Sequence, residues 1–290
     1  MELNNFLTFI MYTNQNYIPI AKISLDGFFK NCGDQKIKKY LVSNSFEEET
    51  KHLLQNFDIE LFNSNVPFSD GGYHYSKTIL NLLDNINTDY VMIFLDDYTI
   101  TRPIKWNNIN NLIKLMIDQE IDYFSFMSYD YNWKELDIDY SEYNFENQKL
   151  MIFDNSYFYM YSVQPSIWKK TALKEFLEYN QNLSLHHCDT SYFFNKKGII
   201  RGHHEDGFYV DKEFYDYEFK NTCFKKNSLT GNFAFDTHNG EDDYLFFLYS
   251  EIIRWGKFNL KTHHNNKMFL EKLFDEFSEI KNDPNYQKFI

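Results

Sequence analysis

The segment that most constrains the fold runs from Tyr90 to Ile104, with the sequence YVMIFLDDYTITRPI. It begins with an apolar run, Tyr90 to Leu95, and becomes polar at Asp96 and Asp97. An apolar run ended by turn residues predicts a central strand of a parallel sheet, because helices cover both faces of such a strand. Ligands of these sheets bind just beyond the carboxyl ends of the strands. The two carboxylates are therefore predicted to lie where a ligand binds.

Two adjacent carboxylates repel each other, by about 4 kcal/mol at ~4 Å for an effective dielectric constant of ~20. A buried pair therefore needs a cation or a shared proton. Mg²⁺ and Mn²⁺ prefer oxygen ligands, and Mg²⁺ is typically held by one or two carboxylates together with substrate phosphates. The Asp96–Asp97 pair thus suits a site for a divalent metal ion and a diphosphate. The alternative is a solvated turn in which neither carboxylate binds a ligand.

Strand-like and helix-like segments alternate through the first 130 residues. Strands are predicted for residues 5–12, 39–42, 58–62, 90–95 and 123–127. Apolar residues at helical spacing predict a helix in each of the four intervals, around Ile18 to Phe28, Leu53 to Phe57, Ile79 to Ile86 and Ile109 to Met116. This order predicts an α/β fold with a mostly parallel sheet flanked by helices and right-handed connections.

Polar residues follow three of these strands. Because the carboxyl ends of parallel strands meet at one edge of the sheet, we expect these residues to lie together. They are Thr13, Asn14, Ser43, Asn44, Asp96 and Asp97.

The pattern is weaker after residue 127. Residues 128–155 mix acidic and aromatic residues and are interpreted as an insertion, as an acceptor-side loop, or as a surface excursion without a role. Residues 157–164 predict a strand, and the segment after PSIWKK predicts a helix carrying Leu173, Phe176 and Leu177. Two further helices are predicted, one with Leu245, Leu248, Tyr249 and Ile252 ending at Gly256, and one with Leu270, Leu273, Phe274 and Phe277.

Charge and composition exclude several classes of protein. The net charge is −13, with 42 acidic residues against 29 Lys and Arg, which argues against broad binding to nucleic acid or to an anionic membrane. A site that handles phosphates would need a metal ion to supply positive charge. The three cysteines include no CxxC pair and indicate a reducing compartment. With no signal peptide and no apolar run near the ~20 residues of a membrane span, we expect a cytoplasmic protein, at most peripheral to a membrane.

Four elements together resemble a known family: the first strand with its polar end, the second strand ending in Ser-Asn, the segment TDYVMIFLDDY, and the later sequence QPSIWKK. This arrangement resembles glycosyltransferases of the GT-A fold, and most of all those of bacterial and viral surface-glycan synthesis. The resemblance covers residues 5–205. The family signature is usually Asp-any-Asp, whereas here the carboxylates are adjacent, as in relatives with an LDD motif.

The resemblance implies a glycosyltransferase that uses Mn²⁺ or Mg²⁺. It would move a sugar from a nucleoside diphosphate sugar to a glycan or a lipid-linked acceptor. Asp97 would bind the metal ion that bridges the two phosphates, and Asp96 would face the ribose or reach the metal through water. The remaining nucleotide contacts implied are Thr13, Asn14, Ser43, Asn44, Tyr75 and Lys77.

The acceptor side of the reaction needs a base, because the attacking hydroxyl must lose its proton. In inverting relatives this base is an Asp or Glu, and Asp189 is the candidate here; the alternative is a helix N-cap. GT-A enzymes often complete the metal shell with a later histidine. His203 and His204 fit that place, with His238 and His263 as competitors.

Three smaller motifs are open to two readings. Residues 239–243, NGEDD, resemble the acidic base motif of other glycosyltransferase families, or simply form the acidic first turn of a helix. Trp168 either stacks against a sugar or fills the core. The pair Lys169-Lys170 is predicted to be solvated at a helix start.

The predicted domains follow from the resemblance and from the later helices. Residues 1–234 form the glycosyltransferase domain, with a nucleotide-binding half over 1–130 and an acceptor-binding half over 131–234. Residues 235–290 form a helical C-terminal extension.

Three other functions remain open. A sugar-nucleotide nucleotidyltransferase would share the strand-end carboxylates, but usually carries a Gly-rich basic loop after the first strand, where this chain has TNQNY. A zinc hydrolase or structural zinc site would use side chains between residues 186 and 206, although neither HExxH nor CxxC spacing is present. Its candidate ligands are His186, His187, Cys188, Asp189, His203, His204, Glu205 and Asp206. The third is a catalytically inactive binding module with the same fold.

Overall fold

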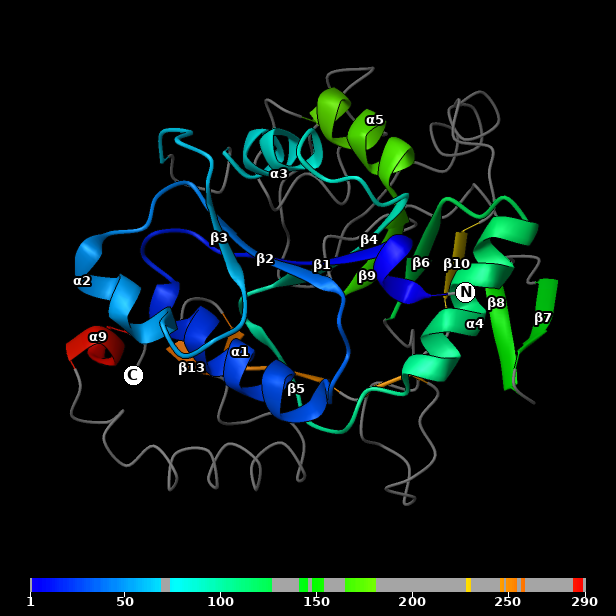
Figure 1. The fold of residues 1–290 in the computed structure, drawn as a ribbon, viewed down its shortest axis with the longest axis horizontal. Helices are drawn as coiled ribbons and strands as arrows, with labels where there is room; N and C mark the ends of the chain where they lie inside the picture. Colours follow the sequence, from blue (N-terminus) through cyan, green and yellow to red (C-terminus); the bar gives the residue numbers. More distant parts are fainter. Residues whose placement is uncertain are drawn as a thin grey trace, which may run out of the picture.

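The computed structural model describes residues 2–68, 74–126, 141–145, 148–153, 165–180, 228–230, 246–247, 249–254, 257–258 and 284–288. The strands of the main sheet are β1 (Leu7–Tyr12), β2 (Lys38–Ser43), β3 (Glu60–Asn63), β4 (Tyr90–Leu95), β6 (Tyr123–Ser125), β7 (Ser141–Phe145), β8 (Gln148–Phe153), β9 (Ser166–Lys169) and β10 (Ser228–Thr230). Within these residues the sheet has the order β3-β2-β1-β4-β9-β6-β10-β8-β7 (Figure 1).

Four neighbouring strands, β3, β2, β1 and β4, run parallel, and β9 lies antiparallel between β4 and β6. The predicted α/β fold with a mostly parallel sheet is therefore confirmed. Each of the five strands predicted in the first 130 residues is present. The segment from 128 to 155, interpreted as an insertion or loop, contributes the antiparallel pair β7 and β8 at the end of the sheet.

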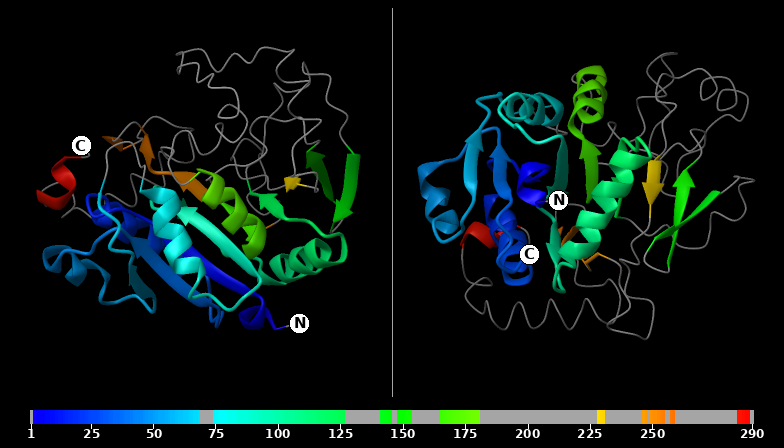
Figure 2. Two further views of the ribbon diagram at one scale, coloured as in Figure 1. Left: turned by 90° about the horizontal axis from the view of Figure 1, so that it is seen from above. Right: turned by 45° about the vertical axis from the view of Figure 1, so that its right-hand side comes forward.

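Helices cover both faces of the sheet (Figures 1 and 2). They are α1 (Ile18–Asn31), α3 (Tyr75–Leu83), α4 (Trp106–Asp118) and α5 (Lys170–Asn180). Phe9 and Met11 of β1 share a buried cluster with α1 and α4, whereas Ile10 and Tyr12 share one with α3 and α5. Because alternate residues of a strand point to opposite faces, covering both faces requires an uninterrupted apolar strand.

Between β2 and β3 the chain is less helical than predicted. The expected helix around Leu53 to Phe57 is replaced by a short α2 (Glu48–Lys51) followed by one 3-10 turn, η2 (His52–Leu54). Only Leu54 of this turn is buried, so the segment lacks the broad apolar face that stabilises a longer helix.

The order of the strands reverses between β1 and β4. From β1 the chain passes outward to β2 and β3, then returns across β1 to enter β4 on its other side. Tyr12 at the end of β1 is the register partner of Leu95 at the end of β4. In open α/β sheets such a reversal is the usual place for a ligand, because the loops leaving the two strands turn to opposite sides.

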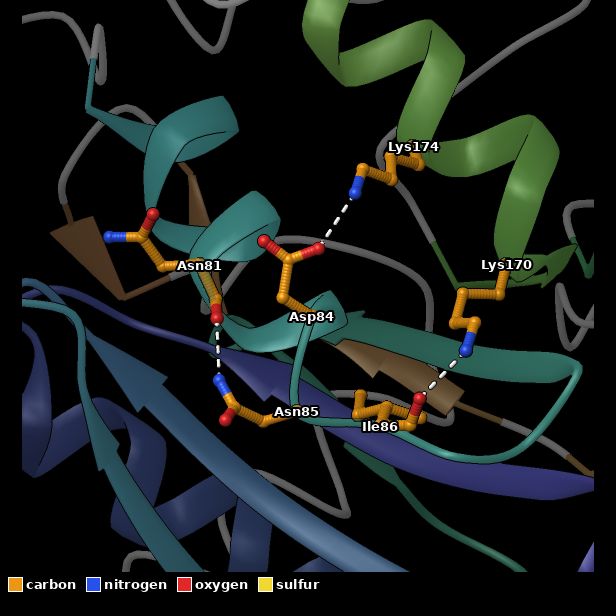
Figure 3. Close-up of polar contacts among 6 residues, drawn as sticks. All are labelled: Asn81, Asp84, Asn85, Ile86, Lys170 and Lys174. Atoms are coloured by element: carbon orange, nitrogen blue, oxygen red, sulfur yellow. Dashed lines mark hydrogen bonds and ion pairs between the residues drawn. The ribbon is translucent and has the colours of Figure 1, made fainter.

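The QPSIWKK sequence forms β9 and the start of α5. Trp168 is 2% exposed and donates from Nε1 to Ser166 Oγ at 3.0 Å, so it fills the core. Lys169 and Lys170 are both partly exposed, and α5 begins at Lys170, as predicted for this pair. Lys170 also has a partner that was not predicted, since its Nζ donates to the backbone carbonyl of Ile86 at 2.7 Å (Figure 3). One turn later Lys174 pairs with Asp84 at 2.7 Å. Both lysines link α5 to the segment that leads from α3 into β4.

The predicted helix carrying Leu245 to Ile252 is wrong. Residues Tyr249–Glu251 form a strand, β11, which pairs antiparallel with β5 (Tyr98–Ile100), the strand that follows the two aspartates. Phe246, Phe247 and Ile252 are fully buried. Among the described residues of this segment, Phe247 and Tyr249 pack against Phe94 of β4 and help to fill the core there.

The rest of the predicted extension is described only in part. After β11 come two strands of two residues each, β12 (Ile253–Arg254) and β13 (Lys257–Phe258), which pair antiparallel. The last described element is one short helix, α9 (Pro284–Gln287). The boundary predicted near residue 235, the strand at 157–164 and the helix at 270–277 lie outside the described residues and stay predictions. Among the described helices, none is long and apolar enough to cross a membrane.

Gly27 sets the separation between α1 and β5. A Cβ atom added there would lie 2.1 Å from Thr99 Oγ1 and 2.8 Å from the carbonyl oxygen of Ile100. Alanine normally favours a helix over glycine, but overpacking of this kind costs about 1–3 kcal/mol. We therefore expect Gly27→Ala to lower the free energy of unfolding measured by urea denaturation.

Gly33→Ala is the matched control for this substitution. Gly33 has a φ of +59° and open space around it, so alanine costs only the left-handed backbone strain, about 1 kcal/mol. A Gly27→Ala protein as stable as the wild type would contradict the close approach of α1 to β5.

Candidate functional site

The site begins with a hydrogen bond between the ends of β1 and β4. Thr13 directly follows β1 and Asp96 directly follows β4, so the register of the two strands makes them neighbours. Thr13 Oγ1 donates to Asp96 Oδ2 at 2.5 Å. Thr13 is 0% exposed and Asp96 is 8% exposed. A carboxylate is thus buried at the reversal of the strand order.

Burial makes the charged form of Asp96 costly. It raises the pKa of the carboxyl group from 3.8 to about 7, against the opposing effect of the hydrogen bond from Thr13 and of a backbone hydrogen bond. No lysine, arginine or histidine in the described part of the chain forms an ion pair with Asp96. A bound cation would restore the charged form.

Asp97 lies beside it at the start of the turn into β5. Its side chain is half-buried, with Oδ1 shielded from solvent, and its backbone carbonyl accepts a hydrogen bond from the Ile252 amide at 2.7 Å. The two carboxylates offer only oxygen donors, which suits a hard divalent cation such as Mg²⁺ or Mn²⁺. Asp96 and Asp97 are thus the residues that would hold the metal ion.

Tyr17, which precedes α1, lies close enough to Asp96 and Asp97 for their charges to act on its phenol. Burial raises the pKa of its phenol, and the nearby charges of Asp96 and Asp97 raise it further. The hydroxyl group therefore stays protonated and can donate a hydrogen bond. The sequence pattern did not point to this residue, because the predicted site residues are polar residues at strand ends, whereas Tyr17 lies at the entry to a helix.

The loops after β1 and β2 are joined by a polar network. The backbone amide of Gln15 donates a hydrogen bond to Asn44 Oδ1 at 3.1 Å. In return, Asn44 Nδ2 donates a hydrogen bond to Gln15 Oε1 at 2.8 Å. Ser43 Oγ donates to the carbonyl of Ser45 at 2.8 Å. Gln15 is a second residue that the sequence did not reveal, since a lone glutamine in a loop carries no pattern. The network fixes both loops beside the carboxylates.

The two predicted contacts on α3 differ in their surroundings. Tyr75 opens the helix but is 2% exposed, and its ring packs edge-on against Tyr12 with centroids 4.7 Å apart. Lys77 is exposed. The structure brings six of the predicted residues to one edge of the sheet: Thr13, Asn14, Ser43, Asn44, Asp96 and Asp97. Their nucleotide-binding roles, like those of Tyr75 and Lys77, stay predictions.

Other predicted site residues lie outside the described residues. These are the candidate base Asp189, the candidate metal ligands His203 and His204, and their competitors His238 and His263. The segment NGEDD at 239–243 and the alternative zinc ligands between 186 and 206 lie there too. Within the part that is described, no cluster of three or more His, Cys, Asp or Glu residues has the geometry to hold a metal ion. Asp96 and Asp97 would therefore need ligands from the substrate, from water or from the later part of the chain.

No protein-family model matches the sequence, and no curated protein matches it. The fold resembles solved structures that include the mannosyltransferase PcManGT from Pyrobaculum calidifontis in complex with GDP-Man and Mn²⁺, at 14% identity and a TM-score of 0.40, over 65% of this chain and 51% of that chain. It also resembles TarS from S. aureus, at 11% identity and a TM-score of 0.38, over 64% of this chain.

A third similar structure is CMP:2-keto-3-deoxy-manno-octonic acid synthetase complexed with CTP, at 8% identity and a TM-score of 0.39, over 66% of this chain and 86% of that chain. The chain spans only 34% of TarS. GT-A glycosyltransferases and nucleotidyltransferases both occur among these neighbours. The likeness is one of fold, and at these scores it assigns neither a donor nor an acceptor.

The raised pKa of Asp96 predicts how the metal-free protein responds to pH. The folded protein holds this proton more tightly than the unfolded chain does. Protonation of Asp96 therefore adds to the free energy of unfolding; this contribution is complete below pH ~4 and is lost as the pH rises to about 7. Asp96→Asn keeps a side-chain oxygen that accepts the hydrogen bond from Thr13, but the side chain at position 96 can no longer ionise. We expect the free energy of unfolding of this variant, relative to wild type, to increase between pH 4 and pH 8 in EDTA.

Urea denaturation at several pH values measures this difference. Asp34→Asn changes an exposed aspartate and provides the control. A difference between Asp96→Asn and wild type that does not vary with pH would show that Asp96 is not buried as described.

Proposed function

We propose that the chain is a metal-dependent glycosyltransferase that moves a sugar from a nucleoside diphosphate sugar to a glycan or lipid-linked acceptor. One observation carries this proposal: the adjacent carboxylates of Asp96 and Asp97 lie at the carboxyl edge of the sheet where the strand order reverses, with Thr13 bonded to Asp96. The resemblance of TDYVMIFLDDY and QPSIWKK to GT-A enzymes supports the same assignment.

The electrostatics of the site require a cation if the ligand is a diphosphate. The chain has a net charge of −13, and the site itself presents two carboxylates to an anionic substrate. A divalent ion held by these carboxylates supplies, when bound, the positive charge that stabilises a departing nucleoside diphosphate. Mn²⁺ and Mg²⁺ are the ions that this donor set favours.

The two aspartates differ in burial and in hydrogen bonding, and we propose a different role for each. Asp96 is nearly buried and one of its oxygens accepts from Thr13, whereas Asp97 is half-buried beside it. We assign Asp97 as the direct ligand of the metal ion. Asp96 would face the ribose or reach the metal through water, as the resemblance implies. Tyr17 would hold its phenolic proton and donate a hydrogen bond within the site.

The nucleoside would lie over the ends of β1 and β2. Asn14, Ser43 and Asn44 are at this edge, and the bonds between Gln15 and Asn44 hold the two loops in fixed positions. Rigid polar groups bind a ligand with less loss of conformational entropy than mobile ones. On the acceptor side, Asp189 remains our candidate for the base that takes the proton of the attacking hydroxyl.

The loop after β1 argues against a nucleotidyltransferase. Such an enzyme would use backbone amides of this loop to hold a triphosphate, but here the amides of Thr13, Gln15, Asn16 and Tyr17 are engaged within the protein. The backbone amide of Thr13 donates to the carbonyl of Val42, and that of Tyr17 donates to the carbonyl of Asn14. The backbone amides of Gln15 and Asn16 donate to the side chains of Asn44 and Asn14, respectively. The loop also contains no glycine, lysine or arginine.

A thermal-shift screen against UDP, GDP, CMP and dTDP, each with and without Mn²⁺, tests the proposal. A ligand at ~100 times its Kd stabilises the folded state by about 2.7 kcal/mol. We expect one nucleotide to raise the Tm only when Mn²⁺ is present. No shift with any nucleotide would overturn the proposal and favour a zinc site or a non-enzymatic module.

Substitution of Asp97 tests the metal assignment. Asp97→Ala is expected to remove the metal-dependent shift and to reduce turnover of the matching sugar nucleotide by at least about 100-fold, because a ligand that stabilises the leaving group is lost. Asp34→Ala, at an exposed site, is the matched control. Turnover by Asp97→Ala at the wild-type rate would exclude Asp97 as the ligand.

A further inference from the structure

A buried serine on α1 contacts the backbone of the candidate metal site. Ser24 is 0% exposed and lies among the apolar residues with which α1 faces the sheet. Its Oγ donates to the backbone carbonyl of Asp96 at 2.5 Å. A serine inside a helix commonly bonds a carbonyl of the preceding turn of its own helix. Ser24 instead bonds a residue 72 positions away.

Three elements thus hold the two aspartates. Thr13, after β1, donates a hydrogen bond to the carboxylate of Asp96. Ser24, on α1, donates one to the backbone carbonyl of Asp96. The amide of Ile252, which follows β11, bonds the carbonyl of Asp97 at 2.7 Å. Because each peptide group is planar, fixing two successive carbonyls restricts the direction in which the Asp97 side chain leaves the backbone.

A glycine on α1 lets the helix pack closely enough for Ser24 to make this contact. Gly27 lies three residues after Ser24, on the same side of the helix, and allows α1 to approach β5 so closely that a Cβ there would meet Thr99 and Ile100. β5 begins directly after the aspartate pair and is paired with β11. Ser24 and Gly27 together bring the helix against the turn and the strand that follows it.

We propose that Ser24 is a positioning residue for a divalent metal ion bound by Asp96 and Asp97, acting through the backbone of the turn that carries them. The proposal rests on the metal site of the proposed function. Octahedral ions tolerate little error in the position of a ligand, and binding sites hold their groups to within about 0.5 Å of the productive geometry. Loss of the Ser24 bond releases the Asp96 peptide group and loosens the carboxylates.

Titration of the protein with Mn²⁺ alone tests this role, with electron paramagnetic resonance used to measure the free ion. Ser24→Ala removes the hydroxyl, and Ser24→Cys keeps a side chain of similar size with a weaker donor. We expect Ser24→Ala to weaken Mn²⁺ binding about fivefold and Ser24→Cys to weaken it less, as for loss of one hydrogen bond. The spectrum of the bound ion should also broaden in the alanine variant.

Thr8→Val is the matched control. Thr8 is 0% exposed on β1, and its hydroxyl bonds Thr88 at 2.8 Å near the opposite edge of the sheet. This variant should lose stability, as measured by urea denaturation, without a change in Mn²⁺ affinity. An equal loss of affinity in Thr8→Val and Ser24→Ala would show that affinity follows stability and would overturn the proposal.

The outcomes also separate this inference from the proposed function. If wild type binds Mn²⁺ and both Ser24 variants bind it equally well, Ser24 has no positioning role and the metal site stands. If wild type binds no Mn²⁺ and no nucleotide raises its Tm, the metal site itself is wrong and the positioning role is overturned with it.

Discussion

The hydrogen bond from Thr13 to Asp96 is the interaction on which the site depends. It joins the ends of the two strands between which the strand order reverses, and it exists because their register aligns Tyr12 with Leu95. A shift of one residue in that register would move every side chain of a strand to the other face of the sheet. Alternate residues of β1 and β4 pack into two different buried clusters, so such a shift would disrupt the close packing of both. This packing fixes the register, and the register fixes the site.

Burial of Asp96 opposes folding whenever the carboxyl group is charged, and the surrounding structure must offset that cost. The hydroxyl of Thr13 satisfies one oxygen, while helix and sheet packing supply the stability. Sites that bind a charged ligand commonly carry strain or unfavourable charge that the rest of the fold supports. The Asp96 carboxylate that destabilises the metal-free protein is one of the two that a divalent cation would bind.

Much of the fold was predictable because its signals are local. The apolar run at Tyr90 to Leu95 predicts β4 to the residue, and the periodicity around Ile109 predicts α4. The mistake at Tyr249 has a physical cause: helical spacing and a short buried strand place apolar residues similarly, and only the distant pairing with β5 decides between them. Similarly, polar strand ends revealed Thr13 and Asp96, whereas Ser24 on an apolar helix face gave no signal.

The position of β11 also affects when the site is completed during synthesis. Asp96, Asp97, Thr13 and Ser24 all emerge from the ribosome early, but the amide that holds the carbonyl of Asp97 belongs to Ile252. A growing chain released only as far as β6 has both carboxylates and lacks this donor, together with the strand that covers β5. Since domains fold as they emerge and long-range contacts form late, such a chain can pair only β3, β2, β1 and β4, because β9 lies between β4 and β6, and its aspartate turn is still open on one side.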